Sequence, residues 1–127
     1  MLNPMTDTVT LYSRISDRWV GTQLTGTAIR YAQGQGLTAA GPKVTDKHTI
    51  LYIPVRGGRR SPEQLEAEEE KNGLFTLRPG DYVALGEGKT GEFTGEIRKQ
   101  VPEALRITAV TDRIRGTVLD HWEVEAV

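Results

Sequence analysis

The sequence contains no cysteine, and it has only two histidines, His48 and His121. Disulfides, thiolate catalysis and cysteine-ligated zinc are therefore excluded. The sequence also lacks a long apolar stretch, since no run approaches the roughly 18 residues that a membrane-spanning helix needs. Its first residues show none of the charged-then-apolar patterning of a signal peptide. We expect a protein that is made in the cytoplasm and has no membrane partner.

An excess of charge of either sign is also missing. The 16 Lys and Arg residues nearly balance the 17 Asp and Glu residues, which leaves a formal net charge of −1. A dedicated nucleic-acid binder normally carries a strong basic excess, so the composition argues against one and leaves room only for a local basic patch. The 127 residues match the length of one domain, which is large enough to bury a single core. We therefore expect one domain over residues 1–127.

Fourteen glycines and six prolines interrupt the chain at short intervals, as is typical of turn-rich β proteins. Several segments between them are rich in β-branched and aromatic residues and alternate apolar with polar positions. Gly21 and Gly26 fall inside the longest segment and predict a bulge or bend, and Pro54 predicts the end of another strand. The predicted strands are residues 8–15, 19–31, 48–55, 74–77, 81–85, 96–110 (one strand or two) and 117–126, with glycine-rich loops at 33–47 and 86–95.

This series of short strands shows no βαβ rhythm, no internal repeat and no linker. It predicts an all-β, mainly antiparallel fold, in the form of a small β-barrel. One short helix is predicted near residues 62–71, within a charged loop-helix inserted at 56–73. Because only Leu65 and Ala67 give this helix an apolar face, we expect it to be mostly solvated. A deletion of residues 62–71 is then expected to change the stability little.

The start of this helix has a clear sequence signature. Ser61 is the predicted N-cap, Pro62 suits the first helical position, and Gln64 stands at the spacing of a capping box. The pair Asn72-Gly73 is expected to end the helix.

Residues 86–91, GEGKTG, look like the end of a phosphate-binding loop. Such a loop needs a glycine, four residues and then Gly-Lys-Ser/Thr, with a helix directly after it. Counting back from Gly88, the first glycine is replaced by Val83, and the following residues GEFTGE have no helical pattern. We therefore interpret the segment as a glycine-rich hairpin loop and expect no nucleotide cofactor.

Other catalytic or metal-binding patterns are weak. His121, Glu123 and Glu125 would share one face of a strand, which the polar face of a terminal strand explains equally well. No Gly-x-Ser-x-Gly motif surrounds any serine, and glutamates on a solvated helix lack the dry pocket that raises the pKa of a general acid. We expect a protein that is not an enzyme and that holds neither a metal nor a cofactor.

The tract 56–73 is the segment that most suggests a partner, because it is basic at its start and acidic further on. A flexible arginine loop can contact phosphates or carboxylates, and the two halves of the tract can also pair with each other or with a second copy. The candidate interface or channel-loop residues are Arg56, Arg59, Arg60, Glu66, Glu68, Glu69 and Glu70.

The order of segments resembles a known family. It comprises TVTLYSRI, RWVGTQLTGTAIRY, HTILYIPV, RPGDYVALGE and ITAVTDRIRGTVLDHWEVEA, which together cover most of residues 8–126. The most diagnostic pieces are Ile53-Pro54, Gly80-Asp81-Tyr82 followed by Gly86-Glu87, and Gly116 with His121-Trp122. This series is similar to the small neck proteins of long-tailed bacteriophages, which include head–tail connector and head-closure (stopper) proteins.

The resemblance implies a structural protein of the virion neck, assembled in the host cytoplasm. In this family, small barrels form a ring (a hexamer or a dodecamer) below the portal and adaptor, contact the tail or its terminator, and retain the packaged DNA without sequence specificity. A mobile loop projects toward the channel in such rings, and we expect residues 56–73 or the loop 33–47 to be the channel or interface element. Rings of this kind use heterologous interfaces, in which one patch meets a different patch on the neighbour.

Four other functions remain open at this point. The sequence does not distinguish a neck protein from a tail-terminator ring protein or a capsid decoration protein. A small-ligand-binding barrel is a different class, in which the aromatic residues Tyr12, Trp19, Tyr31, Tyr52 and Trp122 would line a pocket. An enzyme would need an acid–base pair or a metal that the sequence does not reveal.

Overall fold

The computed structural model describes residues 6–38, 41–117 and 120–127, with the backbone alone described between residues 31 and 48. Most of these residues lie in β-strands, and the helical part consists of two short segments. The elements are β1 (Asp7–Ile15), β2 (Arg18–Thr38), β3 (Gly41–Pro54), α1 (Pro62–Ala67), β4 (Tyr82–Leu85), β5 (Gly91–Thr94), α2 (Ile97–Gln100), β6 (Leu105–Arg113) and β7 (His121–Ala126).

Six strands close into a barrel in the order β1-β4-β6-β7-β3-β2, because β1 also pairs with β2. Every pairing between these strands is antiparallel. The short strand β5 lies outside the ring and pairs with the first residues of β2. The predicted all-β barrel is therefore confirmed.

The first hairpin has a tight connection, since only Ser16 and Asp17 separate β1 from β2. Ser16 adopts a positive φ of 50°, which suits the two-residue loops of β-hairpins. The register between β1 and β2 shifts between Asp7 and Val9, opposite Gly26, whose φ is 70°. The bend predicted at Gly26 is thus confirmed as a β-bulge.

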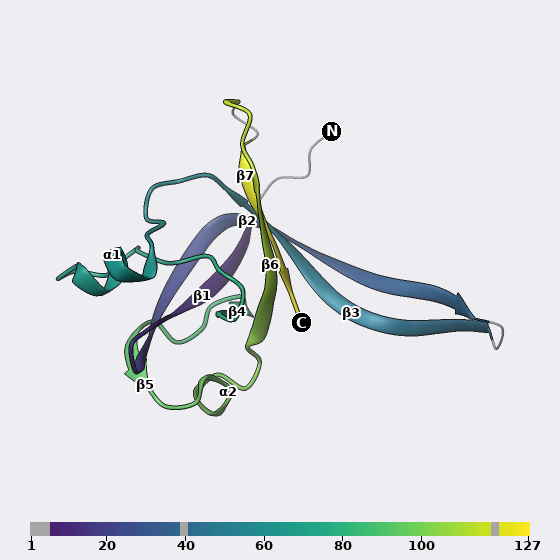
Figure 1. Cartoon of the computed structure of the whole chain (residues 1–127), viewed down its shortest axis with the longest axis horizontal. Helices are drawn as coiled ribbons and strands as arrows, with labels where there is room; N and C mark the ends of the chain where they lie inside the picture. The colour runs from purple at the N-terminus through teal and green to yellow at the C-terminus, as the bar shows by residue number, and fades with distance from the viewer. Residues whose placement is uncertain (1–5, 39–40, 118–119) are drawn as a thin grey trace.

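The predicted loop at residues 33–47 is wrong. Strands β2 and β3 continue through this region, pairing from Ala28 with Tyr52 out to Thr38 with Gly41. Figure 1 shows them leaving the barrel as a long two-stranded ribbon, which we call the arm and define as residues 33–38 and 41–47. Glycine and polar residues have low β propensity, but antiparallel pairing satisfies the backbone whatever the side chains are.

The middle of the chain also differs from the prediction. Residues 74–77 form no strand and make a single bridge, in which Phe75 pairs with Arg59. Phe75 and Leu77 nevertheless enter the core, which explains their apolar character. The segment 96–110 begins with α2 before β6 starts at Leu105, and β5 lies within the segment predicted as a glycine-rich loop.

The barrel interior is filled by one main cluster of buried side chains. Its members are Val9, Leu11, Leu24, Leu51, Ile53, Phe75, Leu77, Val83, Ile107, Trp122, Val124 and Ala126. A second cluster packs Tyr12 and Trp19 beneath α2 and β5, with the Tyr12 and Phe93 rings 5.8 Å apart. In β7, buried and more exposed positions alternate as predicted, but the strand begins at His121 and not at Thr117 as predicted.

Helix α1 begins as the sequence predicts. The Ser61 side chain accepts from the backbone N–H of Gln64, the Gln64 side chain accepts from the backbone N–H of Ser61, and Pro62 occupies the first turn. The helix ends at Ala67, earlier than Asn72-Gly73 predicted. Leu65 is fully buried against Ile15 and Val20, while most other helix residues are exposed. The helix is therefore mostly solvated but anchored by one side chain.

Candidate functional site

The GEGKTG segment folds over Tyr12 and does not form a phosphate cradle. The Thr10 hydroxyl donates to the carbonyl of Gly86 (3.0 Å) and accepts from the N–H of Gly88 (2.9 Å). A Cβ at Gly88 would collide with the hydroxyl oxygen of Tyr12. Lys89 lies over the Phe93 ring, 4.8 Å from its centroid. Close approach to a buried tyrosine thus explains Gly88, whereas Gly86 and Gly91 adopt positive φ values of 86° and 87°.

His121 and Glu123, on the strand face considered for a metal, each contact a different neighbour. His121 packs edge-on against Tyr52, with ring centroids 5.4 Å apart, and Glu123 accepts from Arg113 at 3.0 Å. Across the part of the chain that the structure describes, no three His, Asp or Glu residues are placed to hold a metal ion. Neither α1 nor α2 is long and apolar enough to cross a membrane, and the described residues contain no other helix.

The three arginines of the charged tract contact their own chain. Arg56 donates to the carbonyls of Thr25 (2.6 Å) and Pro54 (3.1 Å), which fastens the bulge of β2 to the end of β3. Burial lowers the pKa of the Arg56 guanidinium. Arg59 pairs with Asp112 at 3.0 Å and lies over Trp122, and Arg60 approaches Glu68 at 3.8 Å.

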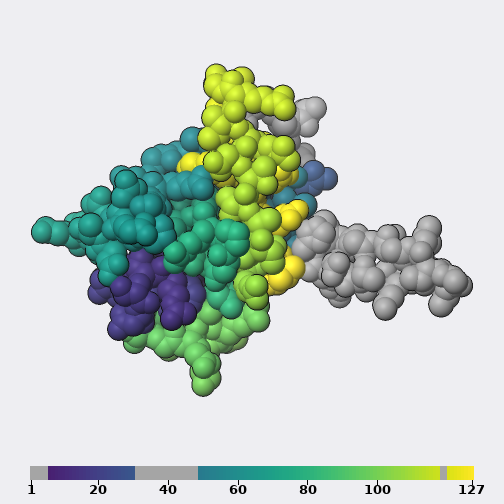
Figure 2. All heavy atoms as spheres, viewed as in Figure 1, coloured from purple at the N-terminus to yellow at the C-terminus, as the bar shows by residue number. Residues whose placement is uncertain are grey.

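The glutamates in the acidic half of the tract are mostly exposed. The Glu66 carboxylate accepts from the hydroxyl of Ser16, which ties α1 to the β1–β2 turn. Glu69 and Glu70 are exposed and make no ion pair with any residue that the structure describes. Figure 2 shows this part of the chain, in teal, standing out from the body of the molecule.

Arg59 and Arg60 share a small cleft of about 310 Å³ with Arg78, Ser61 and Thr76. The cleft gathers three guanidinium groups, but each has a carboxylate of its own: Asp112, Glu68 and Asp81 respectively. Its charge is therefore largely balanced within the chain. The arginine cluster that the sequence indicates acts mainly in holding the barrel together.

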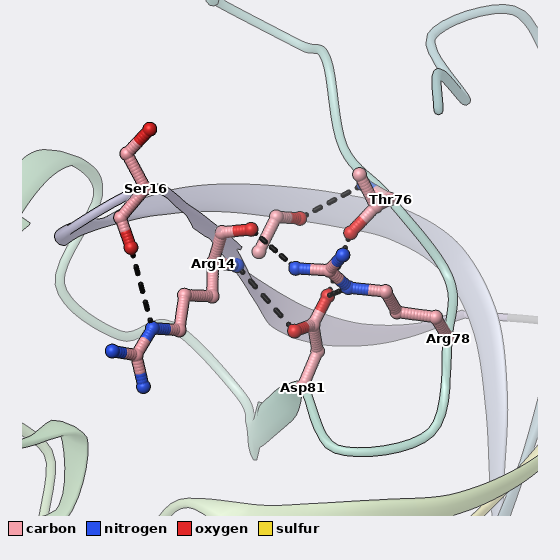
Figure 3. A network of polar contacts seen from close by, with 6 residues as sticks. Arg14, Ser16, Thr76, Arg78 and Asp81 are labelled. Atoms are coloured by element: carbon pink, nitrogen blue, oxygen red, sulfur yellow. Dashed lines mark hydrogen bonds and ion pairs between the residues drawn. The ribbon is translucent and has the colours of Figure 1, made fainter. Parts of the chain in front are cut away.

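A buried carboxylate fastens the Gly80-Asp81-Tyr82 motif to β1. Asp81 is 3% exposed and accepts from the Thr76 hydroxyl (2.7 Å) and from Nε of Arg78 (3.0 Å). Arg78 also donates to the carbonyl of Arg14, and the Thr76 N–H donates to the Ser13 hydroxyl at 2.8 Å, as Figure 3 shows. Burial raises the pKa of Asp81 despite these partners. The motif is thus a structural junction.

A second cleft, of about 660 Å³, lies at a place that no pattern in the sequence indicated. It lies between the β1–β2 turn, the start of β4 and α2, and Arg14, Trp19, Tyr82, Ile97 and Arg98 are among its lining residues. Arg14 lies over Trp19 (5.7 Å) and Arg98 over Tyr82 (5.4 Å). No sequence signal would have found it, because its residues come from distant segments that meet only when the barrel closes.

The aromatic residues proposed for a ligand pocket mostly serve the core. Tyr12, Trp19 and Trp122 are each buried, and Tyr52 is half-buried against His121. The side chain of Tyr31 lies outside the described residues, as does that of His48. Because side chains fill the barrel interior, the structure argues against a ligand held inside the barrel.

Comparison with known proteins gives one match. No curated protein and no solved structure matches the chain. A family of unknown function, DUF6751, has a model that matches residues 4–127. Since this match spans nearly the whole sequence, the chain belongs to the family DUF6751.

Proposed function

We propose that this protein is a structural component of the neck of a long-tailed bacteriophage, where a ring of copies joins the portal and adaptor to the tail and helps to retain the packaged DNA. The series of motifs that resembles neck proteins motivates this function. The observation that carries it is the arm, a two-stranded ribbon that extends from a small closed barrel.

The arm is built for contact with another chain. Among the described residues, residues 33–38 pair only with 41–47, whereas nearer the barrel β2 also pairs with β1 and β3 with β7. Each arm strand therefore has one edge of unpaired backbone groups, and such edges readily add a strand from a neighbour. An isolated two-stranded ribbon is also marginally stable in water, so an assembly would stabilise it.

The remainder of the molecule suits a scaffold. The motif residues that carry the resemblance lie at structural positions: Asp81 at a buried junction, Trp122 in the core and Gly116 at a turn with a φ of 77°. The carboxylate of Asp120 accepts from three successive backbone N–H groups of that turn, those of Arg115, Gly116 and Thr117. A body held together by these contacts suits a scaffold from which the arm projects.

A tail-terminator ring protein is the second candidate, because the same arm and barrel would serve a ring at the tail end. A capsid decoration protein would instead bind singly or in small clusters across the head. These three functions predict different defects in the particles of a phage that lacks the protein.

The experiment is to delete the gene for this chain in the phage that encodes it and to examine the lysate by electron microscopy. If the protein acts in the neck, heads of the deletion phage should package DNA, fail to join tails and then lose that DNA. Free tails of normal length should accompany them. Tails of uncontrolled length would identify a terminator. Normal tailed particles would contradict a neck function.

A further inference from the structure

We propose that the cleft lined by Arg14 and Arg98 is a carboxylate-binding site, and that its occupant is the pair Glu69 and Glu70 of a second copy of this chain. The inference deepens the ring assembly proposed above and rests on it. It assigns a second contact between one copy and the next, in addition to that of the arm, through two different patches on the same molecule.

The two arginines have unused donors. Arg14 uses Nε toward the carbonyl of Ser16 (3.5 Å) and Arg98 uses Nε toward the carbonyl of Ala104 (3.3 Å). Neither side chain makes an ion pair with a residue that the structure describes, and no terminal guanidinium nitrogen of either one is hydrogen-bonded there. Figure 3 shows the terminal nitrogens of Arg14 pointing away from the Asp81 junction.

The same two side chains are held in place before any ligand binds. The backbone of Arg14 is fixed on both sides, because its N–H faces Asp81 (3.5 Å) and its carbonyl accepts from Arg78. The rings below the two guanidinium groups, Trp19 and Tyr82, pack edge-to-face with centroids 5.6 Å apart. A planar guanidinium laid on an aromatic ring presents its outer nitrogens to a carboxylate with little loss of freedom.

The rim of the cleft selects the class of ligand. Asp17 and Glu96 also line it, so its charge is mixed. A chain of phosphates would meet these acids at successive positions and be repelled, since like charges placed side by side disfavour binding. A polypeptide that offers one or two carboxylates beside polar or basic residues fits better. The observations therefore favour a protein ligand over nucleic acid.

The acidic run of a second copy has the required chemistry. Glu69 and Glu70 are exposed and free of ion pairs among the described residues, whereas the ammonium group of the following Lys71 is turned inward, 3.9 Å from Glu92. Figure 1 shows α1 at one side of the barrel and α2 below it, and the acidic run shares no residue with the lining of the cleft. Contact between two different patches is heterologous, and it closes into a ring when the rotation between copies permits.

The test is a charge-reversal exchange on the full chain, followed by native mass spectrometry. One variant carries Arg14→Glu and Arg98→Glu, and the other carries Glu69→Arg and Glu70→Arg. Each alone is expected to lose association by at least about tenfold, because like charges then face each other. Mixing the two should restore assemblies in which the variants alternate. Arg106→Glu serves as the control, since Arg106 is exposed and its side chain makes no described contact.

Thermal unfolding shows whether each variant folds, and Arg98→Glu alone replaces the double variant if Arg14 proves necessary for folding. A wild-type chain that remains monomeric, or an assembly that both variants leave intact, overturns the inference. Binding of labelled single-stranded DNA that Arg98→Glu abolishes would also overturn it, in favour of a nucleic-acid occupant. None of these results alters the gene-deletion phenotype, so the neck function is tested separately.

Discussion

The guanidinium of Arg59 lies 5.1 Å from the centroid of the Trp122 ring, and its Nη1 donates to Asp112 at 3.0 Å. An arginine of the charged tract thus covers the tryptophan of the main core and links it to the end of β6. Trp122 also packs edge-on against Phe75, with ring centroids 6.0 Å apart. The tract is therefore part of what holds the barrel together.

Replacing Arg59 should destabilise the barrel through lost packing as well as lost charge. We expect Arg59→Ala to lower the free energy of unfolding by about 1–2 kcal/mol, since a cation–π contact and the cover of an apolar ring disappear together. Urea unfolding measures this change. Arg115→Ala, at an exposed position, should remain within about 0.5 kcal/mol of the wild type. Equal losses for both variants would contradict a specific role for Arg59.

Replacing Trp122 should lower the free energy of unfolding far more than replacing Arg59. It is 4% exposed, so Trp122→Ala should cost about 3–5 kcal/mol through the cavity that it leaves. Trp122→Phe keeps part of the ring and should cost clearly less. Chemical unfolding of both variants checks this order, and a mild loss in Trp122→Ala would show that the residue lies outside the core.

The buried anchor of α1 changes the expected effect of removing that helix. Leu65 is 0% exposed, so Leu65→Ala should cost about 2–5 kcal/mol. A deletion of residues 62–71 should accordingly lower the melting temperature, contrary to the expectation from the sequence. Ala67→Ser, at an exposed position of the same helix, is the matched control. An unchanged melting temperature in the deletion variant would mean that α1 does not dock.

A side chain at Gly88 should be tolerated better when Tyr12 is replaced as well. Gly88→Ala places a methyl group against the Tyr12 hydroxyl and should cost about 1–3 kcal/mol by overpacking. Tyr12→Phe removes that oxygen and should recover part of the loss in the double variant. Gly57→Ala, which meets no atom within 4 Å, is the control. Additive losses in a double-mutant cycle would contradict the contact.

Asp81 and Asp120 should give opposite pH dependences. Burial raises the pKa of Asp81, so its ionisation costs stability, and wild type should lose stability relative to Asp81→Asn as pH rises from about 3.9 through the raised value. Hydrogen bonds from Arg115, Thr117 and Gly116 lower the pKa of Asp120. The advantage of wild type over Asp120→Asn should therefore be present above about pH 3.9 and disappear as pH falls through the lowered value. Unfolding curves across this range check both, and parallel trends would contradict the assignment.

Shortening the arm separates its role from that of the barrel. Residues 34–46 can be replaced by Asn-Gly, because Gln33 and Lys47 face each other across the ribbon. We expect the variant to keep the melting temperature of wild type, since the arm makes no described pairing with the barrel, and to fail to assemble. Native mass spectrometry measures assembly, and full assembly without the arm would remove the observation on which the proposed function rests.

Local patterns predicted the parts of the fold that depend on local rules. The strand at residues 8–15, the alternation in the second half of the predicted strand 117–126, the cap at Ser61 and the strand end at Pro54 all agree with the structure. The arm was missed because glycines and polar residues there resemble a loop, and only cross-strand pairing identifies it as a strand. The opposite error occurred at Phe75. Its apolar segment was predicted to be a strand, but it enters the core with only a single β-bridge.

The candidate site shows the same limit. Arg59 and Arg60 were identified as a cluster, but their carboxylate partners, Asp112 and Glu68, emerge only from the folded chain. Arg14 and Arg98 lie far apart in the sequence and carry no motif. The cleft they share is a product of tertiary closure, which a pattern within one segment does not reveal.

The most direct test of a neck function is quantitative mass spectrometry of purified virions from the phage that encodes this chain, with the portal protein as the internal standard. The proposed ring predicts copy numbers equal to the portal or a simple fraction of it. Numbers on the scale of the major capsid protein would make the chain a decoration protein, and its absence from particles would contradict a structural role in the virion.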